Sequence, residues 1–147
     1  MSILVAGQND VNQLSSGKSD TSSPSSIGIK FHNIVSYSIY SQHAVMVTSS
    51  GVPSCIGDNT NFPIYANLGK HLITWTSYTI KENGKNYLVE SAVCGLNYTL
   101  YLVKESANDK TKSLFYVQRN KKKGHPYILN TNGWTIVSIY GGCETAA

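Results

Sequence analysis

The residues of this sequence best suited to acid–base, nucleophilic or metal chemistry are histidines and cysteines, and they are scattered along it. They are His32, His43, His71, His125, Cys55, Cys94 and Cys143. No two histidines are spaced to share a metal on one helix, and no two cysteines form a Cys-x-x-Cys pair. The sequence also lacks a Gly-x-Ser-x-Gly nucleophile motif and a phosphate-binding loop. We therefore predict no catalytic residue, no metal and no cofactor, and hence a protein that is not an enzyme.

Cys55 and Cys94 leave one alternative open. An odd number of cysteines without a pairing pattern favours buried free thiols in a reducing compartment. Nucleophilic catalysis by one of these thiols with a histidine is the alternative, and no local motif supports it.

One short run of the sequence has an electrostatic signature. Much of the formal net charge of +4 lies in residues 119–123, where Arg119, Lys121, Lys122 and Lys123 stand close together. A solvated turn between two strands accounts for such a run, and a contact for phosphates or for an acidic partner is the alternative. We name these four residues as candidate partner-binding residues.

The composition favours β-structure. Hydrophobic residues make up 41% of the chain and charged residues 14%, with many tyrosine, serine, threonine and β-branched residues. Trp75, Trp134 and the tyrosines lie in alternating runs, so we expect them to pack within and between sheets and not to serve as stacking platforms.

Neither end of the sequence nor its interior predicts membrane insertion. The first residues, Met1 to Leu14, lack the basic region and the long apolar stretch of a signal peptide. No apolar run approaches the roughly 18 residues that cross a bilayer. We expect a soluble protein of the cytoplasm or nucleus with no membrane contact.

Alternating and β-branched runs predict strands and little helix, since no segment keeps a helical apolar period over three turns. The expected strands are 34–39, 44–48, 52–56, 71–80, 86–93, 99–103, 113–118 and 134–140. Residues 49–51 should close a hairpin with Gly51 at positive φ, and residues 81–85 should form a tight turn. Residues 15–26 and 104–112 are expected to be loops.

Two landmarks recur in the same order, which predicts a repeat architecture. The first is a glycine followed two residues later by asparagine; Gly7 and Asn9 return about 50 residues on as Gly57 and Asn59. A weaker third copy ends at Asn120 if the polar stretch before it is an insertion.

The second landmark is the run 41–47, which returns as 96–102. An alternating stretch precedes each copy. Residues 137–145 look like the opening of a third.

This order of landmarks resembles the repeats of the regulator of chromosome condensation family, over nearly the whole chain. The matching residues are Gly7, Asn9, Gln13, Leu14, His43, Val45, Val47, Gly51, Gly57, Asn59, Ile64, Gly95, Tyr98, Thr99, Leu100 and Leu102. The copies are degenerate, because the family pattern has glycine where this chain has Asn12, Phe62 and Gln118, and histidine where it has Tyr98.

The resemblance implies an all-β fold, a partial β-propeller of about two to three four-stranded antiparallel blades. Residues 1–147 then form a single incomplete repeat domain, with repeats at approximately 3–50, 51–110 and 111–147. His43 is expected to begin a strand and to pack between blades. Because blades stack face to face, we expect neighbouring repeats of a longer protein, or self-association, to cover the terminal faces.

The function that the resemblance implies is an intracellular protein-binding module, an adaptor or scaffold. Guanine-nucleotide exchange for a small GTPase is one alternative, and chromatin or nucleic-acid binding through residues 119–123 is another. The fold alone does not decide among them.

Overall fold

The described residues of the computed structural model, 4–7, 21–26, 33–59, 71–118 and 127–142, form strands joined by turns, with no α-helix among them. The strands are β1 (Leu4–Gly7), β2 (Thr21–Ser26), β3 (Ile34–Tyr40), β4 (His43–Thr48), β5 (Pro53–Asp58), β6 (His71–Ser77), β7 (Ile80–Glu82), β8 (Lys85–Cys94), β9 (Tyr98–Lys104), β10 (Ser113–Gln118) and β11 (Tyr127–Leu129). Within this part of the chain there is no helix whose length and hydropathy would let it span a membrane.

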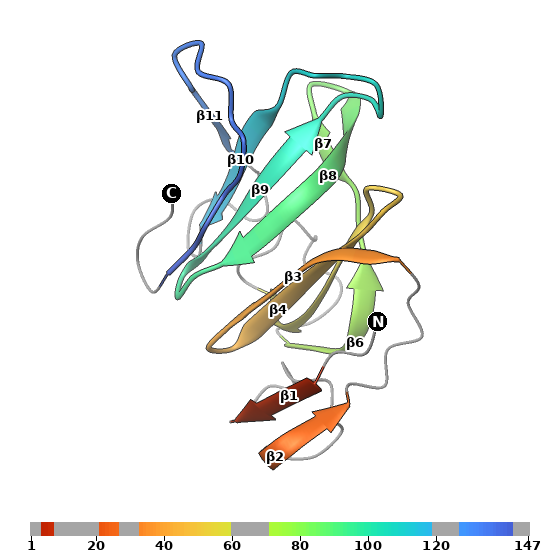
Figure 1. The fold of residues 1–147 in the computed structure, drawn as a ribbon, viewed down its shortest axis with the longest axis vertical. Coiled ribbons are helices and arrows are strands. Elements are labelled where there is room, and N and C mark those ends of the chain that lie inside the picture. Colours follow the sequence, from red (N-terminus) through yellow and green to blue (C-terminus); the bar gives the residue numbers. More distant parts are fainter. Residues whose placement is uncertain (1–3, 8–20, 27–32, 60–70, 119–126, 143–147) are drawn as a thin grey trace.

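The strands form antiparallel sheets in the orders β1-β2, β3-β4-β5-β6 and β11-β10-β9-β8-β7 (Figure 1). We call the β3–β6 sheet the first blade and the β7–β11 sheet the second blade. The predicted all-β partial propeller is confirmed. The second blade differs from the expected four strands because the short β7 pairs with the start of β8.

One apolar core lies between the two blades. It joins Val45 and Val47 of β4 to Tyr101 and Val103 of β9, all of them buried. Side chains alternate between the faces of a strand, so Leu100 and Leu102 lie on the opposite face of the second blade in a separate buried cluster. β9 is therefore apolar on both faces, as a strand between two packed layers must be.

One edge of β8 faces the first blade, and acceptors on the first blade receive hydrogen bonds from the backbone N–H groups of this edge. Three backbone N–H groups that do not pair within the second blade donate to the first: Val89 to the carbonyl of Gly51 at 3.0 Å, Ala92 to Ser36 Oγ at 3.3 Å, and Cys94 to Ser38 Oγ at 2.9 Å. β7 covers only the first residues of this edge, up to Tyr87. The serine hydroxyls of β3 thus do for β8 what a neighbouring strand would do.

Both blades carry a β-bulge at the same place. The register shifts between Ile34 and Ser36 in β3, and between Val89 and Ser91 in β8. The two bulges are as far apart as the two copies of the second landmark. A bulge changes which N–H groups point outward, so the repeated bulge shows that the two blades are built on one pattern.

Most predicted strands are confirmed, with ends shifted by one or two residues. Gly51 has φ of 78°, as the predicted hairpin requires. Asn83 and Gly84, at φ of 50° and 77°, make the predicted tight turn between β7 and β8. The predicted insertion after β9 is the connection from 105 to 112.

The prediction of one strand over 71–80 is wrong, because the chain changes sheets there. β6 ends at Ser77 and pairs with β5, whereas Ile80 begins β7 and pairs with Tyr87 of β8. Between them the Tyr78 N–H donates to the carbonyl of Pro53 at 3.1 Å. Sequence alternation continues through this crossing between blades and does not reveal it.

The prediction of a strand over 134–140 is also wrong, since this segment joins no ladder. Its burial does not alternate. Ile136 and Ile139 turn toward the second blade while Trp134, Val137 and Tyr140 are exposed. This period of three is typical of an extended chain with three residues per turn, not of a strand. The short β11 precedes it and was not predicted.

The predicted loop over 15–26 is wrong in its last six positions, which form β2. Pairing with β1 gives this polar segment hydrogen bonds that its composition does not predict. Pro24 lies where the β1–β2 register is irregular, a place that tolerates a residue without an N–H. Residues 15–20 lie outside the described residues.

We predict that Gly57→Ala destabilises the protein by roughly 3 kcal/mol or more, because Gly57 combines a left-handed backbone with a close approach. Its φ is 96°, and an added Cβ would lie 2.2 Å from the Gln42 carbonyl oxygen. Gly84→Ala is the control, with φ of 77° and no atom within 4 Å of the added Cβ. Denaturant unfolding measures both. Equal losses for the two variants would contradict the close approach.

Candidate functional site

His43 lies in the seam between the blades. Its side chain is buried, and Nε2 is 3.3 Å from both the Tyr98 carbonyl oxygen and Thr99 Oγ1 of β9. The prediction that His43 begins a strand and packs between blades is confirmed. These contacts hold the start of β9 against the start of β4, which is a structural role.

Tyr98 occupies in the second blade the position that His43 has in the first. His43 pairs with Gly57 and Tyr98 pairs with Gln118, so the two residues begin equivalent strands. The Tyr98 hydroxyl donates to the Gly142 carbonyl at 3.0 Å and accepts from the Gly142 N–H at 3.2 Å. Each polar side chain therefore contacts backbone that comes after its own blade in the chain. His43 of the first blade contacts the carbonyl of Tyr98, and Tyr98 of the second blade contacts Gly142. The substitution of tyrosine for histidine keeps this role.

Cys55 and Cys94 are buried in the core between the blades. Burial raises the pKa of the Cys94 thiol to about 12 and that of Cys55 well above its usual value. Each Sγ lies near a backbone carbonyl, that of Ser38 at 3.6 Å from Cys94 and that of Thr76 at 3.7 Å from Cys55. The nucleophile in cysteine catalysis is the thiolate. These thiols are protonated at neutral pH, which counts against the catalytic alternative.

We predict that Cys55 and Cys94 react with a thiol reagent at pH 8 at least about 100-fold more slowly in the folded protein than in urea. The measurement uses a Cys143→Ser variant, so that only the two buried thiols are counted. Stoichiometric labelling of the folded protein within minutes would contradict the burial and the raised pKa of both thiols.

The remaining predicted chemistry residues do not come together in the part of the chain that the structure describes. No group of three or more His, Cys, Asp or Glu residues there is placed to hold a metal. His71 is exposed on β6, and His32, His125 and Cys143 lie outside the described residues. The candidate partner-binding residues Arg119, Lys121, Lys122 and Lys123 also lie outside them, in the sequence between β10 and β11.

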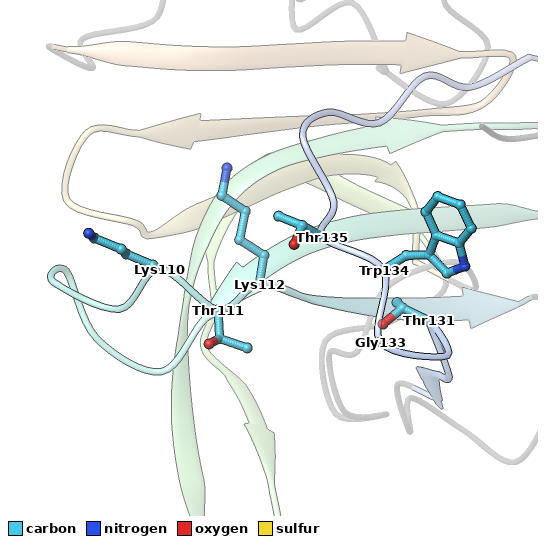
Figure 2. Close-up of a pocket in the computed structure, with 7 residues that line it drawn as sticks. All are labelled: Lys110, Thr111, Lys112, Thr131, Gly133, Trp134 and Thr135. Atoms are coloured by element: carbon cyan, nitrogen blue, oxygen red, sulfur yellow. The ribbon is translucent and has the colours of Figure 1, made fainter.

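A hollow of about 440 Å³ lies between the β9–β10 connection and the turn after β11. Its lining residues are Lys110, Thr111, Lys112, Thr131, Gly133, Trp134 and Thr135 (Figure 2). Figure 2 shows Lys110, Lys112 and Trp134 pointing in different directions, and Lys112 forms an ion pair with Glu90. The described lining has hydroxyls, cations and one aromatic ring, which are groups suited to contact with a partner.

Three large side chains project from the segment that passes this hollow. Trp134 is 80% exposed, Val137 82% and Tyr140 69%. We call these three the exposed row. The expectation that Trp134 packs between sheets is wrong, whereas Trp75 is half-buried and contacts Tyr37, with ring centroids 6.1 Å apart. Spacing by three, in place of two, was the sequence signal for the exposed row.

The backbone that carries the exposed row is anchored to the second blade. Ile139 is 7% exposed and belongs to the buried cluster on the outer face of the second blade, with Leu100 and Leu102. The Tyr98 hydroxyl fixes the backbone of Gly142, just beyond the row. The backbone that carries the row is therefore fixed to the second blade at Ile139 and at Gly142.

Two solved structures share this fold over nearly the whole chain. The crystal structure of human WBSCR16 matches with a TM-score of 0.67 and 16% identity, covering 97% of this chain and 38% of that chain. The crystal structure of Kap60 bound to yeast RCC1 (Prp20) matches with a TM-score of 0.69 and 14% identity, covering 99% of this chain and 37% of that chain. No family model and no curated sequence matches this chain.

These likenesses show the fold and nothing finer, because both identities are low. The chain spans 38% and 37% of the length of the two structures it matches. The resemblance to the regulator of chromosome condensation family is thus supported at the level of fold. The chain has an RCC1-like propeller architecture, of which it supplies a part.

Proposed function

We propose that this protein is a protein-binding module of the propeller type, an adaptor or scaffold that works in the cytoplasm or nucleus. The observation that carries the proposal is the exposed row of Trp134, Val137 and Tyr140. Aromatic side chains are enriched among the residues that dominate protein interfaces.

The support beneath the row favours binding. A surface already held in one conformation loses little conformational freedom when a partner binds. Ile139 packs beneath the row, and Tyr98 bonds the backbone at its end. The lysines and threonines of the adjacent hollow would form a polar rim around an apolar centre, the usual plan of an interface.

The comparison with yeast RCC1 agrees with this proposal in kind. That protein was crystallised with another protein, Kap60, bound to it. A propeller of this type can therefore serve as a protein-binding partner.

We expect Trp134→Ser to abolish capture of a partner that the wild-type chain retains from a cell extract. Truncation of a central aromatic anchor commonly weakens an interface by about 30-fold or more, about 2 kcal/mol. Ile73→Ser is the matched control, because Ile73 is 72% exposed but lies on β6 of the first blade. A partner retained equally by both variants would show that the exposed row is not the binding surface.

The basic run supports a second candidate function, the binding of nucleic acid. Its four cations are a sequence observation, and their placement lies outside the described residues. We predict that replacing Arg119, Lys121, Lys122 and Lys123 with glutamine abolishes any binding to a DNA or RNA duplex and flattens its salt dependence. Binding that is unchanged in filter or anisotropy assays would remove this candidate.

Guanine-nucleotide exchange stays an alternative to which no residue of this chain is assigned. It would be supported by faster release of labelled nucleotide from a small GTPase in the presence of the chain.

A further inference from the structure

The exposed row is arranged so that it matches itself in reverse. Val137 lies midway along the row, with Trp134 three residues before it and Tyr140 three residues after it. If a second segment runs antiparallel across the first with Val137 at the crossing, each tryptophan meets a tyrosine and the two valines meet each other. A self-matching patch of this kind is what a two-fold symmetric dimer requires.

We propose that the exposed row binds a second copy of this chain, antiparallel about a two-fold axis through Val137. This inference rests on the proposed protein-binding function and names the partner. Each dimer would contain two Trp134–Tyr140 contacts between copies. Aromatic pairs of this kind add to the burial of apolar area, provided that the rings meet offset or edge to face.

The charge of the segment favours a second copy as the occupant. Residues 127–142 contain no acidic and no basic side chain. A partner recognised by charge would find no pairing group within this segment. Lys110 and Lys112 border it at Trp134, and Lys112 is already paired with Glu90, so an identical copy meets little like-charge repulsion. The segment 134–140 also contains no proline, so it lacks the devices by which exposed apolar segments commonly avoid association.

The size of the row limits the strength of the dimer. A patch of three large side chains from each copy is smaller than a standard interface, so we expect a dissociation constant on the order of micromolar. The chain should therefore be a monomer when dilute and a dimer when concentrated.

Light scattering on the purified full chain over a range of concentrations tests the proposal. We expect the mass to rise from that of one chain to that of two, and Val137→Lys to raise the dissociation constant at least tenfold because it brings two lysines together at the axis. Ile73→Lys adds the same charge at another largely exposed position, outside the row, and should leave the dimer intact. A wild-type chain that stays monomeric, or a dimer insensitive to Val137→Lys, would overturn the proposal.

Engineered cysteines test the axis itself, in a Cys143→Ser background. Val137→Cys should cross-link to itself under mild oxidation, because residue 137 meets its own mate. Trp134→Cys should cross-link to Tyr140→Cys when the two variants are mixed, but not to itself. Cross-linking of Trp134→Cys alone, or none by Val137→Cys, would contradict the two-fold arrangement.

The outcome separates this inference from the proposed function. A monomeric chain whose capture of another protein still depends on Trp134 would overturn the second copy as partner and leave the binding module standing. If the chain neither dimerises nor captures another protein through Trp134, the exposed row is not a binding surface.

Discussion

The arrangement of the blades depends on how the open edge of β8 is satisfied. A strand edge buried against another layer carries N–H groups that water does not reach, and each costs free energy if it has no acceptor. Here the acceptors are the Ser36 and Ser38 hydroxyls and the Gly51 carbonyl. The Ser36 hydroxyl also donates to the Ala92 carbonyl at 3.4 Å, so one serine serves two backbone groups. This polar seam sets the register in which the apolar faces of the two blades meet.

Hydrogen bonds from side chains to backbone also join the outer face of the second blade to the segment that follows it. Tyr98 bonds the backbone of Gly142 as His43 bonds that of Tyr98, and Ile139 enters the buried cluster there. Segment 134–142 is thus docked as the next element of a propeller would be, but within the described residues no strand pairs along 134–140. Its docked side is fixed and its other side is exposed. The binding surface that we propose is the exposed side of this docked segment.

The sequence predicted what local chemistry decides. Alternating and β-branched runs identified β3, β4, β8, β9 and β10, and the turn residues Gly51 and Gly84 marked two hairpins correctly. Prediction from the sequence failed where pairing between distant segments decides which residues form strands. Residues 134–140 are as rich in β-branched and aromatic residues as a strand is, but strand formation also needs a partner. The chain crosses between blades near Tyr78, and β2 forms from a polar segment; neither is visible in composition or period. Trp134 is exposed in a segment that pairs with no strand among the described residues.

Amide hydrogen exchange at Ala92 and Cys94 tests the polar seam most directly. In the wild-type chain both amides should exchange as slowly as those of the central strand β9, although they lie on an edge of β8 with which no described strand pairs beyond Tyr87. Replacing Ser36 and Ser38 together with alanine should speed their exchange at least about tenfold while Leu100 and Leu102 change little, because only the seam loses its acceptors. Rapid exchange of Ala92 and Cys94 in the wild-type chain would contradict this account of how the blades are joined. Exchange rates of these two amides that stay the same when both serines are replaced would contradict it as well.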